Sequence, residues 1–300
     1  MLLEAGADTN QASTTDGATP LFISAEKGNV EVVKALVEAG ANVDQALTTD
    51  GCTPLYISAQ KGNVEVVKAL VEAGANVDQA LTRDGTTLLH ICAQNGNVEV
   101  VRALLEAGAN VDLASLKDGS APLFISAQNG HAVVVRVLLE AGANIDHATP
   151  IEGATPLYVS ALNGHAKVVR ALLEVGANVD KASSTTHGAA TPLFISARYG
   201  HAKAVRALLE AGADINLTCR QANGMTPALC AGLLGHEEVE KLLRRAPSKV
   251  CGNPDCKHTA WTASMKGEFK KCSGCLGVKY CSQSCQRVHW KEHKKVCNKS

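Results

Sequence analysis

The chain has 300 residues, with 29 Lys and Arg against 29 Asp and Glu, and 46% of its residues are apolar. This apolar content is too high for a disordered chain, and no uncharged apolar stretch approaches the roughly eighteen residues of a membrane span. Residues 1–4 lack the basic flank and apolar run of a signal peptide. We therefore expect an intracellular protein of the cytoplasm or nucleus, with no membrane partner.

Charge and cysteine content divide the chain near residue 246. Residues 1–246 hold 18 basic and 26 acidic residues, a balance of −8, whereas residues 247–300 hold 11 basic and 3 acidic residues, a balance of +8. Seven of the eleven cysteines and both tryptophans also lie in the second part. This shift, beside a proline that follows the last helical pattern, predicts a domain boundary with a linker at 247–250.

A repeat of about 34 residues organises the first part. Each unit opens on a glycine, and the glycines are Gly17, Gly51, Gly85, Gly119, Gly153, Gly188 and Gly224. We predict seven units over 16–246, starting near residues 16, 50, 84, 118, 152, 187 and 223. Residues 1–15 match only the end of such a unit. This partial unit indicates a chain truncated at its N-terminus, with a natural short form as the alternative.

Each unit predicts a pair of short helices. In the first unit, Thr19 is placed to cap a helix that begins at Pro20 and ends at Gly28. Asn29 is placed to cap a second helix with one apolar face, and Gly40 follows its end. Neither helix is long enough to be stable alone. Successive pairs must therefore stack to bury their apolar faces.

The units resemble the ankyrin-repeat family. Its Thr-Pro-Leu-x-x-x-Ala run stands at 19–25, 53–59, 155–161 and 191–197, with weaker copies at 87–93, 121–127 and 226–232. The resemblance implies an α-solenoid of helix-turn-helix units with hairpin fingers, which offers a concave surface to a protein partner. The family usually has His after Thr-Pro-Leu, and His90 keeps it. Five other units have aromatic residues there, so we expect aromatic packing between repeats: Phe22, Tyr56, Phe124, Tyr158 and Phe194.

Residues that recur in every unit are expected to hold the scaffold, because a nucleophile or general base should be singular. This applies to the recurrent serines: Ser24, Ser58, Ser126, Ser160 and Ser196. The turn histidines take the position of Asn29 and are expected to cap helices: His131, His165, His201 and His236. The scattered cysteines are expected to be buried thiols: Cys52, Cys92, Cys219 and Cys230. Phosphate-binding glycine motifs are absent, so we predict neither an enzyme nor a small-molecule substrate.

Partner binding is expected at the ends of the first helices of the units. These ends are polar in the first four units, as in Glu26-Lys27, whereas a later one is Arg198-Tyr199. Arg and Tyr are residue types that favour interface hot spots. Arg198 and Tyr199 are therefore candidate partner-binding residues, and the alternative is a surface with no dedicated ligand.

Cysteine spacing in the second part indicates zinc. The pairs are Cys251-x4-Cys256, Cys272-x2-Cys275 and Cys281-x3-Cys285, followed by His293-x3-Cys297. Seven thiols and one imidazole suffice for two closed four-coordinate sites, whereas disulfides would leave one cysteine over. Closed sites have no open position for substrate, so the two Zn²⁺ ions would be structural. From spacing alone, His258 and His289 are further candidates for the histidine ligand.

Residues 251–297 resemble the MYND zinc-finger family. The resemblance rests on the cysteine pairs, on Tyr280-Cys281-Ser-Gln-Ser-Cys285, and on the run from His289-Trp290 to His293 and Cys297. It implies an interleaved arrangement in which one ion has the ligands Cys251, Cys256, Cys281 and Cys285. The other ion would have Cys272, Cys275, His293 and Cys297. The position of His289 is variable in the family, so His289 is not expected to be a ligand.

The two resemblances together predict a non-enzymatic interaction scaffold. The solenoid would bind one protein, and the zinc module would bind a second protein or a short proline-containing peptide. Trp290 would line the groove of the zinc module, or else pack its core. The basic residues of the tail favour an alternative, a nucleic-acid-associated regulator.

Overall fold

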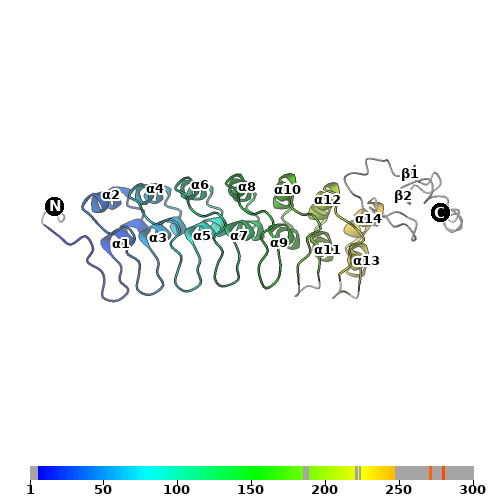
Figure 1. The fold of residues 1–300 in the computed structure, drawn as a ribbon, viewed down its shortest axis with the longest axis horizontal. Coiled ribbons are helices and arrows are strands. Elements are labelled where there is room, and N and C mark those ends of the chain that lie inside the picture. The colour runs from blue at the N-terminus through cyan, green and yellow to red at the C-terminus, as the bar shows by residue number, and fades with distance from the viewer. Residues whose placement is uncertain are drawn as a thin grey trace.

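The computed structural model describes residues 6–184, 189–219, 222 and 224–246, together with the backbone of 270–271 and 279–280. Over these residues the chain forms fourteen helices in seven pairs, arranged as an elongated stack (Figure 1). Among the described helices, none is long and apolar enough to cross a membrane.

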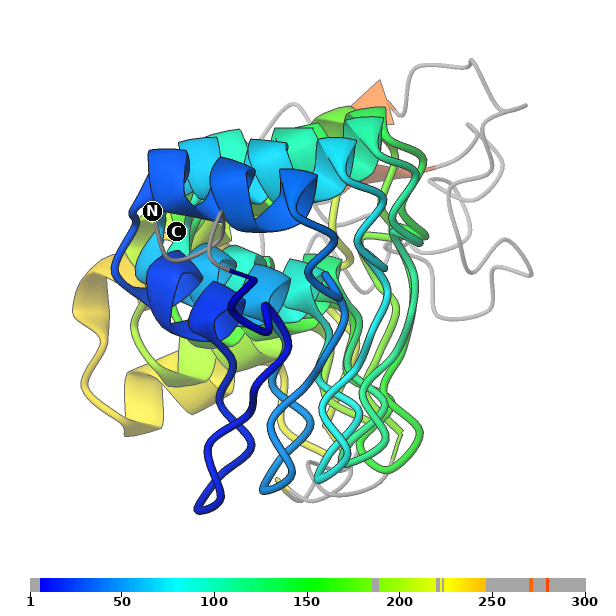
Figure 2. The same cartoon turned by 90° about the vertical axis from the view of Figure 1, so that its left-hand side faces the viewer.

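The first helix of each pair lies in one row, and we call this set the inner helices. They are α1 Pro20–Glu26, α3 Pro54–Lys61, α5 Leu88–Asn95, α7 Pro122–Gln128, α9 Pro156–Leu162, α11 Pro192–Arg198 and α13 Pro227–Leu233. The outer helices form the second row. They are α2 Val30–Glu38, α4 Val64–Glu72, α6 Val98–Glu106, α8 Ala132–Glu140, α10 Ala166–Glu174, α12 Ala202–Glu210 and α14 Glu237–Arg245. Hairpin fingers extend from the side of the inner helices (Figures 1 and 2).

Five of the seven inner helices begin where threonine precedes proline. The Thr19 hydroxyl accepts a hydrogen bond from the Phe22 N–H at 3.2 Å, and Pro20 supplies the first helical position without needing a donor. The same cap recurs at Thr53, Thr155, Thr191 and Thr226. The predicted helix start is therefore confirmed.

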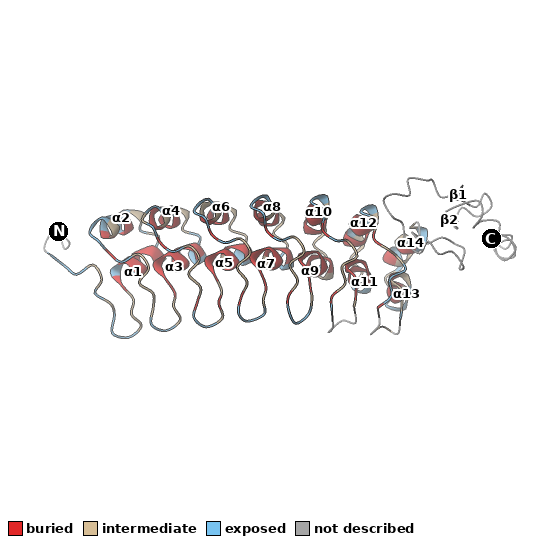
Figure 3. Ribbon diagram, viewed as in Figure 1, coloured by how far each residue is buried: buried red, intermediate tan, exposed pale blue. Residues whose placement is uncertain are grey.

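Apolar residues of both rows meet in one continuous core that runs along the stack (Figure 3). The residue after Thr-Pro-Leu is buried in the first six units, with at most 8% exposed: Phe22, Tyr56, His90, Phe124, Tyr158 and Phe194. The aromatic residues thus belong to the core, as expected. His90 is hydrogen-bonded instead, with Nδ1 at 2.7 Å from the Thr87 hydroxyl and Nε2 at 2.9 Å from the Ser120 carbonyl. Because a carbonyl cannot donate, Nε2 carries the proton.

The expectation that Asn29 and the turn histidines cap their own helices is wrong. These residues make no side-chain cap to the helix that follows them. Instead, His131 Nε2 donates to the carbonyl of Gln94 in the preceding repeat at 2.9 Å. In the same way, each later turn histidine donates from Nε2 to a carbonyl at the end of the preceding inner helix: His165, His201 and His236. The reason is that carbonyls at the end of an inner helix have no partner within that helix.

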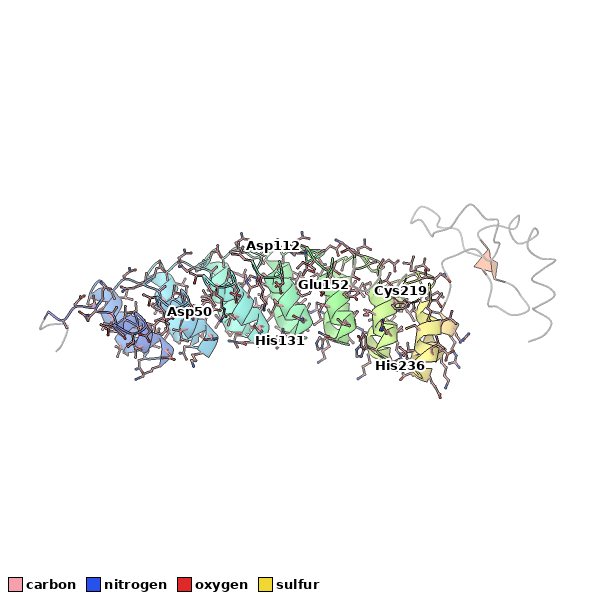
Figure 4. All side chains as sticks on the ribbon, turned by 90° about the horizontal axis from the view of Figure 1, so that it is seen from below. Asp50, Asp112, His131, Glu152, Cys219 and His236 are labelled. Atoms are coloured by element: carbon pink, nitrogen blue, oxygen red, sulfur yellow. The ribbon has the colours of Figure 1, made fainter. Side chains whose placement is uncertain are left out.

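The aspartates at the ends of the units form a second ladder. The Asp44 carboxylate accepts from the Asn76 N–H at 2.9 Å, and Asp78 and Asp112 repeat the contact along the array. Figure 4 shows Asp112 along one edge of the array, and His131 and His236 along the opposite edge. The recurrent serines donate to carbonyls of their own helices, as Ser58 does to Leu55 at 2.8 Å. These repeated polar residues therefore hold the scaffold.

Neighbouring fingers are joined through their backbones. The Leu116 N–H donates to the Asp84 carbonyl at 3.0 Å, and equivalent bonds start from Thr48, Thr82 and Ser184. Pro150 has no N–H, and at that junction His147 Nε2 donates to the Gly119 carbonyl at 3.1 Å instead. The finger tips need glycine because their φ angles are positive and the next finger is close. A Cβ added to Gly119, with φ of 68°, would lie 2.4 Å from Cδ of Pro150. The fingers thus form one connected surface beside the inner helices.

Candidate protein-binding surface and zinc module

The candidate surface combines the fingers with the C-terminal ends of the inner helices. Its first four helix ends are polar, whereas the later ones carry Leu162, Arg198-Tyr199 and Leu233-Leu234. Tyr199 is 50% exposed, so a large aromatic side chain stands where earlier units have lysine or asparagine. The surface therefore changes from polar to apolar toward its C-terminal end.

Arg198 and Tyr199 lie at the C-terminal end of α11, where a hydrogen bond from the next repeat holds the backbone. The Arg198 carbonyl accepts a hydrogen bond from His236 Nε2 of the next repeat at 3.0 Å. The Tyr199 ring stacks on the His201 ring, with 6.3 Å between centroids and 19° between planes. A preorganised aromatic side chain beside an exposed arginine suits protein recognition.

Two hollows of about 270 Å³ each lie between the fingers and the inner helices. The first has a mixed polar and apolar lining, which includes Arg83, His90, Ile91, Gln94 and Asp118. The second lies one repeat further on, and its lining includes Phe124, Ile151, Glu152, Tyr158 and Leu162. The exposed Ile151 at a finger tip makes the second hollow more apolar than the first. Neither hollow is predictable from the sequence, because the lining of each comes from two adjacent repeats.

The electrostatics of the repeats give no sign of an activated nucleophile. Burial raises the pKa of the Cys52 and Cys92 thiols to about 12, so both are protonated at neutral pH. Cys219 and Cys230 are buried as well. Burial also lowers the pKa of His90 below its usual value of 6.5. The cysteines of the repeats are therefore buried core thiols, as expected.

The predicted zinc ligands and Trp290 lie outside the described residues. Those ligands are Cys251, Cys256, Cys272, Cys275, Cys281, Cys285, His293 and Cys297. The described part of the zinc module is one antiparallel strand pair, β1 Lys270–Lys271 with β2 Lys279–Tyr280, in which Lys271 pairs with Lys279. In the repeats and strands that the structure describes, no group of three metal-ligating side chains occurs.

The donor set of residues 251–297 fits zinc by its chemistry. Seven thiols and one imidazole are soft and borderline ligands, which suit tetrahedral Zn²⁺ better than a hard oxygen-seeking cation. Cys272 is bonded to Lys271, and Cys281 is bonded to Tyr280. Because Lys270 pairs with Tyr280, the chain leaves for these two cysteines from opposite ends of the strand pair.

The stacked helix pairs and the joined fingers define an ankyrin-repeat solenoid. The family model for ankyrin repeats (3 copies) matches residues 1–81, 76–149, 144–219 and 179–251. The chain therefore belongs to the ankyrin-repeat family. The family model for the MYND finger matches residues 249–297, so the solenoid is followed by a C-terminal MYND finger. Both resemblances seen in the sequence are confirmed.

Solved structures support the fold. The human ASB11 ankyrin repeat domain matches with a TM-score of 0.66 and 29% identity over 77% of this chain and 100% of that domain. The ankyrin repeat domain of Bcl-3 matches with a TM-score of 0.64 and 28% identity over 76% of this chain and 99% of that domain. The solenoid therefore has the ankyrin fold.

Two curated relatives are similar to this chain over short stretches, which are small fractions of their own length. The zinc finger MYND domain-containing protein 10 homolog of Drosophila melanogaster is 45% identical over 49 residues, which are 16% of this chain and 11% of the relative. The SET domain-containing protein 14 of Caenorhabditis elegans is 60% identical over 30 residues, which are 10% of this chain and 7% of the relative. Ankyrin repeats and MYND fingers are protein-interaction modules that are typically non-enzymatic, and the MYND finger binds zinc.

Proposed function

We propose that the chain is a non-enzymatic scaffold that holds two partners, one on the ankyrin solenoid and one on the MYND finger. The observation that carries the first half is the half-exposed Tyr199 beside Arg198, at a helix end that is polar in the first four repeats. Exposed apolar and aromatic residues at otherwise polar positions mark interaction surfaces. The protein partner would bind across the later inner-helix ends and the adjoining fingers.

A double substitution tests the first half without disturbing the fold. Arg198→Gln with Tyr199→Asn restores the Gln-Asn pair that the fourth repeat carries at 128–129. Quantitative mass spectrometry of proteins captured by the full chain should show at least one partner reduced about tenfold with this variant. The matched control is Gln60→Ala with Lys61→Ala, which alters a polar pair and should retain the partner. Equal capture by wild type and the double variant would contradict the proposal.

The MYND finger would hold two structural Zn²⁺ ions in the interleaved arrangement. Cys251, Cys256, Cys281 and Cys285 would bind one ion, and Cys272, Cys275, His293 and Cys297 the other. The departure of the chain toward Cys272 and Cys281 from opposite ends of the strand pair supports their separation into different sites. Zinc would supply folding free energy, which small zinc modules need because their cores are too small. Metal analysis of the full chain should find two zinc ions.

A protein or a short proline-containing peptide is the partner we propose for the MYND finger, with Trp290 at its groove. A panel of such peptides should show saturable binding to the full chain that chelation abolishes. The alternative partner is nucleic acid, which the +8 balance of residues 247–300 favours. Binding of oligonucleotides with an affinity that falls steeply with salt would support that alternative instead.

The proposed thiol ligands also indicate a cellular location for the protein. Zinc-binding thiols must remain reduced, which favours a reducing compartment. We therefore place the protein in the cytoplasm or nucleus, and imaging of the tagged full chain tests this placement.

A further inference from the structure

The last repeat exposes leucines where the other repeats do not. Leu229 of α13 takes the position after Thr-Pro-Leu that is buried by the following repeat in the six earlier units, and it is 52% exposed. Leu233, four residues later on the same face of α13, is 72% exposed, and Leu234 is 53% exposed. We call these three residues the leucine end face.

The leucines at positions 233 and 234 do not follow from the pattern of the earlier repeats. At the positions of Leu233 and Leu234, the first four repeats have the polar pairs Glu26-Lys27, Gln60-Lys61, Gln94-Asn95 and Gln128-Asn129. A terminal repeat normally needs a polar outer face for solubility. The last inner helix is thus more apolar than its counterparts in the position where it should be more polar.

The outer helix of the same repeat shows the expected polar end. Glu240 takes the position at which Val205 and its equivalents are fully buried. The Glu240 carboxylate forms an ion pair with the Arg244 guanidinium, with 2.7 Å between Oε1 and Nη2. At the end of the stack, α14 therefore presents a charged residue, whereas α13 presents exposed leucines. This contrast indicates that a specific partner covers α13.

We infer that the leucine end face is the docking surface for the MYND finger of the same chain. Only five residues separate Arg245, at the end of α14, from Cys251. Fully extended, this connection spans about 20 Å, and α14 packs directly against α13. Such a short tether keeps the finger at a local concentration in the millimolar range, so a modest apolar contact suffices for docking.

Charge favours the same occupant. The repeats carry a balance of −8 and the tail +8, which zinc-bound thiolates reduce to about +5. The repeats of a second copy would instead bring the same −8 balance to the end face. Docking would also fix the direction in which the finger presents its own partner relative to the concave surface. The inference goes beyond the proposed function, since it requires neither partner to be known.

Hydrogen exchange of the zinc-loaded full chain tests the docking. The test variant is Leu233→Gln with Leu234→Asn, which restores the polar pair of the third repeat at 94–95 and should leave the repeat folded. The control is Leu162→Gln, which replaces the leucine at the position of Leu233 in the fifth repeat. Amides of residues 228–234 should exchange about tenfold more slowly in wild type and in the control than in the test variant.

Chelation of zinc from the wild type should abolish this slowing, whereas residues 55–61 of α3, which no variant alters, should exchange alike in all samples. Equal exchange of residues 228–234 in wild type and the test variant would overturn the inference. Slowing that grows with protein concentration would also overturn it, because a second copy would then be covering the leucines. Slowing that survives chelation would exclude the folded zinc module as the occupant.

Discussion

Phe194 provides the sharpest test of how the repeats hold one another. Its side chain is 1% exposed and lies on α11, which packs against α13 of the next repeat. Phe194→Ala should lower the free energy of unfolding by about 3–5 kcal/mol, because a buried ring is lost and a cavity remains. In a solenoid each repeat depends on its neighbours. We therefore expect the loss to appear first as faster opening of α13 and α14.

Urea unfolding followed by circular dichroism at 222 nm measures the total loss, and hydrogen exchange locates it. A matched control is Val133→Ala on α8, where the side chain is 56% exposed and the expected change is within about 0.5 kcal/mol. A loss below about 1 kcal/mol for Phe194→Ala would refute the reasoning. Faster exchange in α1 and α2 rather than α13 and α14 would refute it as well.

Three further predictions concern single side chains. Because burial lowers the native pKa of His90, the unfolded chain takes up the proton first, so stability should fall as the pH drops below about 6.5, by at most about 1.4 kcal/mol per unit. His90→Phe should remove this difference between pH 7.5 and 5.5 in urea unfolding. Loss of the hydrogen bond to the Ser120 carbonyl, which keeps its bond from the Ser115 N–H, should cost about 1 kcal/mol; equal pH slopes would contradict this. The Cys92 thiol, with its pKa raised to about 12, should be alkylated only as the chain unfolds, and rapid labelling of the native protein would show otherwise. His293→Ala should lower the zinc content by one ion and His289→Ala should not, and the reverse result would contradict the proposed ligand set.

Local patterns predicted the helix pairs because each determinant lies within one repeat. Thr19 and Pro20 specify a helix start over a few residues, and the apolar periodicity specifies the buried face. The MYND finger was equally predictable, since its signal is the spacing of potential ligands along the sequence. These features depend on short-range geometry, so one sequence sufficed.

Contacts between repeats were less accessible to sequence reasoning. His131 was expected to cap its own helix, yet its acceptor is the Gln94 carbonyl, 37 residues earlier in the chain. Likewise, Arg136 on α8 pairs with Glu174 on α10 at 2.9 Å, which no spacing rule within a helix would indicate. The partners of both side chains are determined by the stacking of adjacent repeats. The exposed leucines of α13 are visible only by comparison with buried equivalents in the earlier repeats.

Removal of zinc from the full chain tests most directly the claim that the protein is a scaffold of two independent folds. The chain should release two zinc ions per molecule to a chelator and lose binding of proline-containing peptides, while its circular dichroism at 222 nm remains that of the folded solenoid. Release of fewer than two ions, or collapse of the helical signal on chelation, would contradict this division between an ankyrin solenoid that folds by stacking and a finger that folds on metal.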